Sequence, residues 1–207
     1  RFEDDSELKG HNFGNLFITA LSKVTGDFEK AIKESSKVLA IRGQVVPSTL
    51  HKVKLVAEHI DGTKTIGESK IPYRRVPIKK LYLNPTECNP TQEALEAIYE
   101  AEAIILGPGS LYTSVLPNLL VKGMTEALLR TKAVKIYVCN VMTQPGETDN
   151  FTASDHVKAI IEHSHPKIID YCIINTAPVP FYLLEKYKQE NAYPVVNDSA
   201  KIREWGY

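Results

Sequence analysis

The sequence carries no excess charge of either sign, because 25 lysines and arginines balance 25 aspartates and glutamates over 207 residues. Proteins that bind nucleic acids or membrane surfaces depend on a basic excess that faces phosphate groups. The sequence also has no apolar run near the roughly 20 residues that a helix needs to cross a bilayer. We therefore expect neither a nucleic-acid partner nor a membrane partner.

Cysteine is scarce, and this bears on the cellular compartment. Cys88, Cys139 and Cys172 are odd in number, widely spaced and outside any C-x-x-C pattern. The last two lie in apolar runs typical of buried strands, which favours reduced core thiols in a reducing compartment. The chain begins with Arg1, and residues 1–9 lack the apolar core of a signal peptide. We expect a fragment of a cytoplasmic protein.

The hydrophobic pattern changes twice along the chain. Residues 10–43 have apolar side chains at helical spacing and predict two helices. Residues 44–84 alternate with a period of two around a two-residue Asp61-Gly62 turn, which predicts an antiparallel β-hairpin insert. From residue 89 onward, amphipathic helices alternate with short apolar strands, a pattern typical of a parallel sheet.

No repeat, low-complexity tract or polar linker divides the sequence. Its 43% hydrophobic and 24% charged residues are close to those of an average globular domain. We therefore expect an α/β fold: a three-layer, Rossmann-like parallel sheet that carries the hairpin insert, as a single domain fragment over residues 1–207.

Three of the expected strands end in glycine or asparagine, at Gly107, Asn140 and Asn175. Ligands of open parallel sheets bind outside the carboxyl ends of the strands. The strongest local signal is GPGSLYTS at residues 107–114. Its glycines let peptide N–H groups approach a ligand, and its hydroxyls stand where a helix begins, as in phosphate sites.

The motif at residues 107–114 is neither a Walker loop nor G-x-G-x-x-G. The alternative to phosphate binding is a tight strand-to-helix turn in which the serine is a plain helix N-cap. The candidate ligand-binding residues of this motif are Gly107, Gly109, Ser110, Thr113 and Ser114.

A second candidate is GHNFGN at residues 10–15. His11, Asn12 and Asn15 would occupy the first turn of a helix, where side chains three residues apart are neighbours and could face one ligand. The alternative is that Asn12 simply caps the helix.

The third candidate is the polar segment at residues 140–150, which follows a buried strand. Loops in that position commonly carry function. Glu147 or Asp149 could hold Mg²⁺ through a phosphate, but a solvated loop is the preferred interpretation for these two acids. No residues have the spacing of a metal site held by the protein. Hydrogen bonds to a sugar or a base could come from Thr143, Gln144, Glu147 and Thr148. The candidate ligand-binding residues of this segment are Asn140, Thr143, Gln144 and Glu147.

The segment TASDH at residues 152–156 contains the residue types of a hydrolase triad. Consecutive residues of a helix point in different directions, so Ser154, Asp155 and His156 cannot form a relay among themselves. Thr152 and Asp155 have the spacing of a helix capping box, and we predict that role for them. No catalytic residue is predicted.

These motifs together resemble the YvcK family of gluconeogenesis factors, which is related to the CofD 2-phospho-L-lactate transferases. The resemblance rests on residues 10–15, on GPGSLYTSVLPNLLV at 107–121, on YVCNVMTQPGETD at 137–149 and on residues 152–156. It implies a Rossmann-like fold and a UDP-sugar ligand such as UDP-N-acetylglucosamine. It also implies a cytoplasmic bacterial regulator of carbon metabolism, cell-envelope precursor supply and cell shape.

The sequence departs from that family in one respect. Family members begin with a strand and a Gly-rich phosphate turn, so we expect that this βα unit is missing from the present chain. The residues supply neither a nucleophile nor a poised base, which favours a regulator that binds without turnover. The alternatives are a CofD-like transferase of phosphoryl or phospholactyl type that uses Mg²⁺, and an NAD-binding protein. A homo-oligomer is left open.

Overall fold

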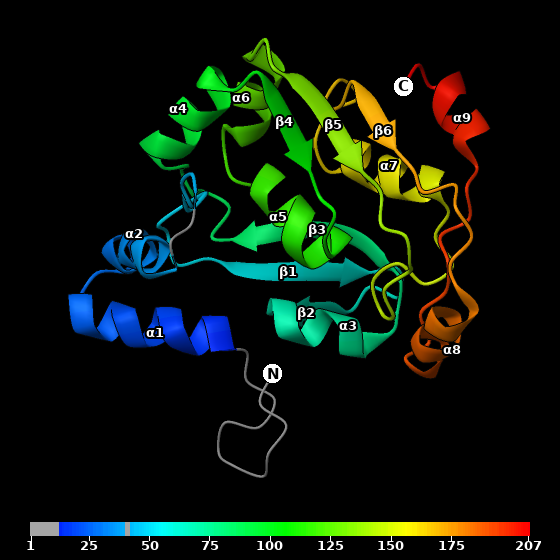
Figure 1. Cartoon of the computed structure of the whole chain (residues 1–207), viewed down its shortest axis with the longest axis horizontal. Helices are drawn as coiled ribbons and strands as arrows, with labels where there is room; N and C mark the ends of the chain where they lie inside the picture. The colour runs from blue at the N-terminus through cyan, green and yellow to red at the C-terminus, as the bar shows by residue number, and fades with distance from the viewer. Residues whose placement is uncertain (1–12, 40–41) are drawn as a thin grey trace. The chain divides into compact units, whose positions relative to one another are not determined.

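The structure, a computed structural model, describes residues 13–39 and 42–207. The chain divides into two compact units, Arg1–Leu50 and His51–Tyr207. Every strand of the described residues lies in the second unit (Figure 1). Across the described ranges, no helix combines the length and the apolar character that crossing a membrane requires.

The first unit contains two helices, as predicted from the apolar spacing. Helix α1 (Phe13–Thr25) packs against helix α2 (Phe28–Val38). Asp27 caps α2, because its carboxylate accepts a hydrogen bond from the Lys30 N–H at 2.7 Å. Only α2 has buried residues, among them Ala31 and Ile32.

The second unit begins with a small antiparallel sheet. Strands β1 (Lys54–His59), β2 (Lys64–Ile66) and β3 (Ile78–Asn84) lie in the order β2-β1-β3. The predicted hairpin is confirmed, with Glu58 opposite Lys64. Its turn is longer than the predicted two residues, because the His59 N–H donates to the Thr63 carbonyl at 2.9 Å and leaves residues 60–62 in the loop. A 3₁₀ turn, η1 (Glu68–Lys70), and a short helix, α3 (Ile71–Arg74), occupy the connection that leads to β3.

The rest of the second unit is built on a parallel sheet, as predicted. Strands β4 (Ala103–Leu106), β5 (Val134–Val138) and β6 (Tyr171–Ile173) lie in the order β4-β5-β6. The helical segments around it are α4 (Gln92–Glu100), the π-helical turn η2 (Leu111–Val115), α5 (Leu116–Leu119), α6 (Met124–Arg130), α7 (Ala153–Glu162), α8 (Phe181–Gln189) and α9 (Ser199–Glu204). The mixed α/β fold is therefore confirmed.

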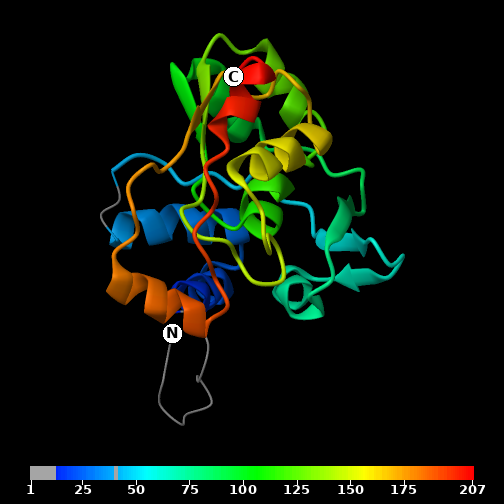
Figure 2. The ribbon, with the colours of Figure 1, turned by 90° about the vertical axis from the view of Figure 1, so that its right-hand side faces the viewer.

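The two faces of the parallel sheet differ. On one face Tyr137 is buried, and α6 and α7 lie on the same side of the strands (Figures 1 and 2). On the other face Ile105 and Tyr171 are each 62% exposed and Ile173 is 54% exposed. Parallel sheets are usually covered on both faces. Within the described residues of this unit, α6 and α7 therefore form a helical layer on the first face of the sheet.

Candidate functional site

The carboxyl edge of the parallel sheet brings two of the predicted segments together. We call residues 107–114, which follow β4, the glycine loop, and residues 140–150, which follow β5, the polar loop. The Asn140 amide closes a two-point contact between them: its Nδ2 donates to the Gly109 carbonyl at 2.8 Å, and its Oδ1 accepts from the Gly109 N–H at 3.1 Å. The sheet thus places Gly109 and Asn140 in direct contact across 31 residues of sequence.

The glycine loop holds the backbone close to the neighbouring strand at one position. Gly107 has a φ of +79°, and a Cβ atom there would lie 3.0 Å from the Val138 carbonyl oxygen. At Gly109 the nearest atom to an added Cβ would be the Ser114 Cβ at 3.7 Å, which is an ordinary contact. Packing therefore requires a glycine at position 107 and does not require one at position 109.

Several polar groups of the glycine loop are available for a ligand. The Ser110 carbonyl accepts from the N–H groups of Ser114 and Val115 at 2.8 and 3.0 Å, which opens the π-helical turn η2. Ser110 gives this turn no side-chain cap, contrary to the plain N-cap alternative. Among the described residues, the Ser110 N–H and the hydroxyls of Ser110 and Ser114 have no hydrogen-bond partner.

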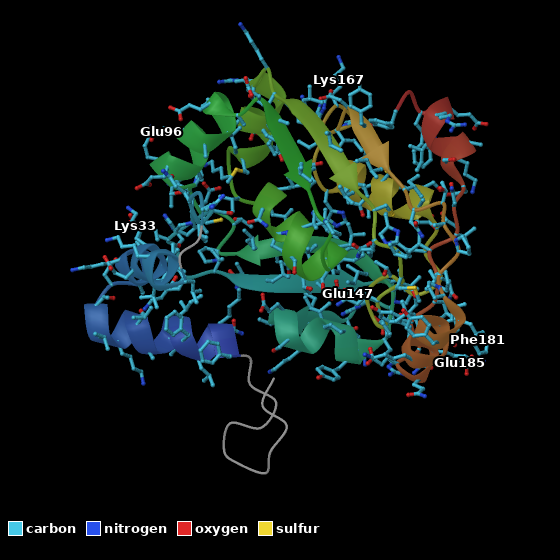
Figure 3. The ribbon with its side chains drawn as sticks, viewed as in Figure 1. Lys33, Glu96, Glu147, Lys167, Phe181 and Glu185 are labelled. Carbon is cyan, nitrogen blue, oxygen red and sulfur yellow. The ribbon has the colours of Figure 1, made fainter. Side chains whose placement is uncertain are left out.

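The polar loop is anchored by a buried carboxylate, that of Glu147, which is only 4% exposed (Figure 3). Its Oε2 accepts from the Tyr112 N–H at 3.2 Å, and its Oε1 accepts from the Thr113 hydroxyl at 2.9 Å and the Gln144 amide at 2.7 Å. Burial raises the pKa of Glu147, and the hydrogen bonds from Thr113 and Tyr112 offset only part of that rise. The preferred interpretation of Glu147 as a solvated acid is wrong; Asp149 is exposed.

The polar loop is also fixed by main-chain contacts. The Thr143 N–H donates to the Tyr193 carbonyl at 2.7 Å, and the Tyr193 N–H donates to the Thr143 hydroxyl at 2.9 Å. Gly146 has a φ of +80°, and a Cβ there would lie 1.8 Å from the Pro72 carbonyl oxygen of α3. The predicted residues Thr113, Thr143, Gln144 and Glu147 therefore hold the two loops in place.

The predicted capping box at the start of α7 is confirmed. The Asp155 carboxylate accepts from the Thr152 N–H at 2.9 Å, and the Thr152 hydroxyl accepts from the Asp155 N–H at 3.3 Å. His156 points into the core, where its Nε2 has no partner among the described residues and burial lowers its pKa. The segment at residues 152–156 is therefore a helix start.

Sequence reasoning missed Asp198, which gives α7 a second cap. Its carboxylate accepts from the Ser154 N–H at 2.8 Å and from the Ser154 hydroxyl at 2.6 Å. Burial alone would raise the pKa of Asp198, but these hydrogen bonds outweigh it and lower the pKa to about 2. The two residues are 44 positions apart, so no local pattern could have paired them.

The remaining candidates belong to residues 10–15, in the first unit of the chain. His11 and Asn12 lie outside the described residues. Asn15 is exposed on α1 in the first unit, where its carbonyl accepts a hydrogen bond from the Thr19 hydroxyl at 2.7 Å. Across the described part of the chain, no three His, Cys, Asp or Glu side chains gather as a metal-binding group.

Sequence reasoning also missed a cavity of about 390 Å³ that is lined in part by Asn140, the residue that holds Gly109. Its walls come from the residues after β5, the segment after β6, the first half of α8 and the segment that leads to α9. We call it the β5–β6 pocket. Its lining residues include Asn140, Val141, Thr176, Leu184, Pro194 and Asn197.

Comparisons with known proteins agree with this architecture. The whole chain, residues 1–207, matches the family model described as 2-phospho-L-lactate transferase CofD. It is 47% identical over 206 residues to a gluconeogenesis factor of Halalkalibacterium halodurans and 45% identical over 206 residues to that of Bacillus subtilis. A crystal structure of a UPF0052 family member from Bacillus halodurans superposes with a TM-score of 0.91 at 47% identity, covering 100% of this chain and 67% of that one.

The chain therefore belongs to the CofD family, within its YvcK branch of gluconeogenesis factors. It is covered completely by both curated relatives, and it spans 64% and 65% of their lengths.

Proposed function

We propose that this protein binds a nucleotide-sugar, of the UDP-sugar type, across the carboxyl edge of the parallel sheet. The Asn140–Gly109 pair carries this proposal, because it fixes the glycine loop while the Ser110 N–H and the hydroxyls of Ser110 and Ser114 stay free. Free N–H and hydroxyl donors on a rigid loop suit the oxygens of a diphosphate. Since the loop is already held in place, little of the binding free energy is lost in ordering it.

The geometry favours binding over chemistry. Glu147 is the buried carboxylate nearest the glycine loop, and both of its oxygens accept hydrogen bonds from the two loops. A general base needs a lone pair within reach of the proton that it removes. Contacts that hold substrate and transition state equally give affinity without acceleration.

The biological role proposed here is regulation. The relatives named gluconeogenesis factors support a role in carbon metabolism. Cell-envelope precursor supply and cell shape are the processes that a UDP-sugar sensor would connect to it. On this proposal, occupancy of the site reports the level of the nucleotide-sugar to the rest of the regulatory system.

A second candidate is a transferase of phosphoryl or phospholactyl type, favoured by the description of the matching family. Mg²⁺ bound to the diphosphate would supply charge neutralisation in such a reaction. In this chain, the polar-loop carboxylate that could bind the Mg²⁺ is that of the exposed Asp149. Its Oδ2 already accepts a hydrogen bond from the Gly146 N–H at 2.7 Å.

The two candidates are separated by incubating the full-length protein with UDP-N-acetylglucosamine and Mg²⁺. A regulator returns the nucleotide-sugar unchanged, gains about 2.7 kcal/mol of stability at 100 times the Kd, and protects the amides of the glycine loop from hydrogen exchange. Conversion of the nucleotide-sugar that is lost in Asp149→Asn, with Glu126→Gln as an exposed control on α6, would overturn the regulator and favour the transferase.

A further inference from the structure

No charged side chain lines the β5–β6 pocket. None of the twelve residues that line it is Asp, Glu, Lys, Arg or His. A diphosphate needs cationic groups or clustered hydrogen-bond donors, such as those of the glycine loop, to leave water. The pocket is therefore suited to an uncharged group, and its volume lies within the usual range of small-molecule sites.

The walls of the pocket are preformed. The Val195 N–H donates to the Val141 carbonyl at 2.9 Å, and the Ala153 N–H donates to the Val196 carbonyl at 2.9 Å. Together with the Thr143–Tyr193 pair, these bonds join the segment before α9 to the polar loop and to the start of α7. A ligand would enter this space without first ordering the segment.

One side chain connects the pocket with the glycine loop. Asn140 lines the pocket and also holds both main-chain polar groups of Gly109. One and five residues after Gly109, Ser110 and Ser114 offer their free donors. A ligand with phosphates at these donors would therefore have its adjacent uncharged part at the pocket.

The lining favours a flat ring over a sugar. Eight of the twelve lining residues are apolar, including Val141, Leu184 and Pro194. The Asn175 amide is already paired with the main chain of Ala177, at 2.8 and 3.2 Å. A sugar requires a partner for each buried hydroxyl, whereas a nucleobase buries two apolar faces and presents polar atoms along its edge.

Two polar groups of the lining are available to form hydrogen bonds with the edge of a nucleobase. The Thr176 hydroxyl has no hydrogen-bond partner among the described residues. Asn197 uses its Oδ1 to accept from the Ser199 N–H at 3.0 Å, which leaves its NH₂ group for a ligand. We propose that the β5–β6 pocket binds the uncharged, planar base of a nucleoside diphosphate whose phosphates lie on the glycine loop; this inference rests on the proposed function above.

Calorimetric titration of the full-length protein with UDP and with inorganic pyrophosphate tests the pocket. We expect UDP to bind at least tenfold more tightly than pyrophosphate. Leu184→Trp fills the pocket and should weaken UDP binding at least tenfold while pyrophosphate binding stays within twofold. Glu185→Trp is the matched control, since Glu185 is exposed on the same helix and does not line the pocket (Figure 3). It should change neither affinity.

Thr176→Val provides a second arm, because it removes only the hydroxyl and keeps the side-chain shape. It should weaken UDP binding by roughly three- to tenfold, as expected for one lost hydrogen bond. The pocket proposal is overturned if wild-type protein binds pyrophosphate as tightly as UDP, if folded Leu184→Trp keeps its UDP affinity, or if Thr176→Val does so when Leu184→Trp does not fold.

The same titrations distinguish this inference from the proposed function. UDP-N-acetylglucosamine that binds equally well to the wild type and to both pocket variants overturns the base pocket and leaves nucleotide-sugar binding standing. UDP binding that depends on Leu184, without any binding of UDP-sugars, supports the pocket and overturns the proposed function. Absence of binding by every nucleotide and nucleotide-sugar overturns both.

Discussion

Gly109 and Gly146 lie in the two loops that meet at the carboxyl edge of the parallel sheet, yet their surroundings differ. Gly146 has a positive φ, and an added Cβ would come within 1.8 Å of the Pro72 carbonyl oxygen. At Gly109 an added Cβ would make ordinary contacts with Ser114 and Val115, at 3.7 and 3.9 Å. The fold needs a glycine in the polar loop and tolerates a side chain in the glycine loop.

The difference extends to the polar groups of the two loops. In the polar loop, the side chains of Glu147 and Thr143 form hydrogen bonds with other segments of the protein. In the glycine loop, the hydroxyls of Ser110 and Ser114 have no partner among the described residues. Buried or half-buried polar groups in native proteins usually have partners. The polar loop therefore holds the glycine loop in place, and the glycine loop presents the unpaired hydroxyls.

The largest effect on stability is expected for Gly146→Ala. The Cβ clash with main-chain atoms of Pro72 forces one of the two segments to move, and the positive φ adds strain. We expect a loss of about 3 kcal/mol in the free energy of unfolding, measured by urea denaturation. Gly62→Ala is the control, because Gly62 has the same φ of +80° with nothing within 4 Å. A loss no greater than that of Gly62→Ala would contradict the assignment of Gly146 as a close-contact glycine.

Asp198→Asn should have the next largest effect, and its size should depend on pH. The folded pKa of about 2 lies below the ordinary aspartate pKa of 3.8. The carboxylate therefore stabilises the folded state above pH 4, and this contribution is lost as the pH falls through 2. We expect the variant to be about 2 kcal/mol less stable near pH 6 and equal to the wild type near pH 2. A difference that stays constant between these two pH values would show that Asp198 acts through packing.

Asp155→Asn should cost about 1 kcal/mol or less, as expected for one weakened capping interaction. Thermal unfolding of the variant measures this loss, and Lys158→Gln on the exposed face of the same helix is the control. Nucleotide-sugar affinity should be unchanged, because Asp155 is occupied with Thr152. A tenfold loss of affinity in the folded variant would place Asp155 in the ligand site.

Features set by neighbouring residues could be predicted from the sequence. The β-hairpin around Asp61-Gly62, the capping box of Thr152 and Asp155, and the alternation of strands and helices after residue 89 all depend on short spacings. Each of them was confirmed, since local backbone preference and the local hydrogen bond agree with the packing around them.

Features set by distant residues could not be predicted in this way. Asn140 forms hydrogen bonds with Gly109, which is 31 positions away, and Ser154 forms hydrogen bonds with Asp198, which is 44 positions away. Glu147 was assigned to solvent because acidic residues are seldom buried. Its three donors come from η2 and from the polar loop itself, and only the folded sheet edge brings them together. The pocket was missed because its lining residues also come from segments that are distant in the sequence.

Gly109→Ala should have the smallest effect on stability and should test the comparison most directly. Its Cβ meets only ordinary contacts, so the free energy of unfolding should stay within about 1 kcal/mol of the parent. The same Cβ lies on the Ser114 side of the loop, beside the free hydroxyls, and we expect it to weaken UDP-sugar binding at least tenfold. Gly109→Val should abolish that binding. Calorimetry and thermal unfolding on the same samples measure both quantities. Wild-type affinity in the folded Ala variant would mean that the glycine loop is only a turn, because nothing else at position 109 calls for the absence of a side chain.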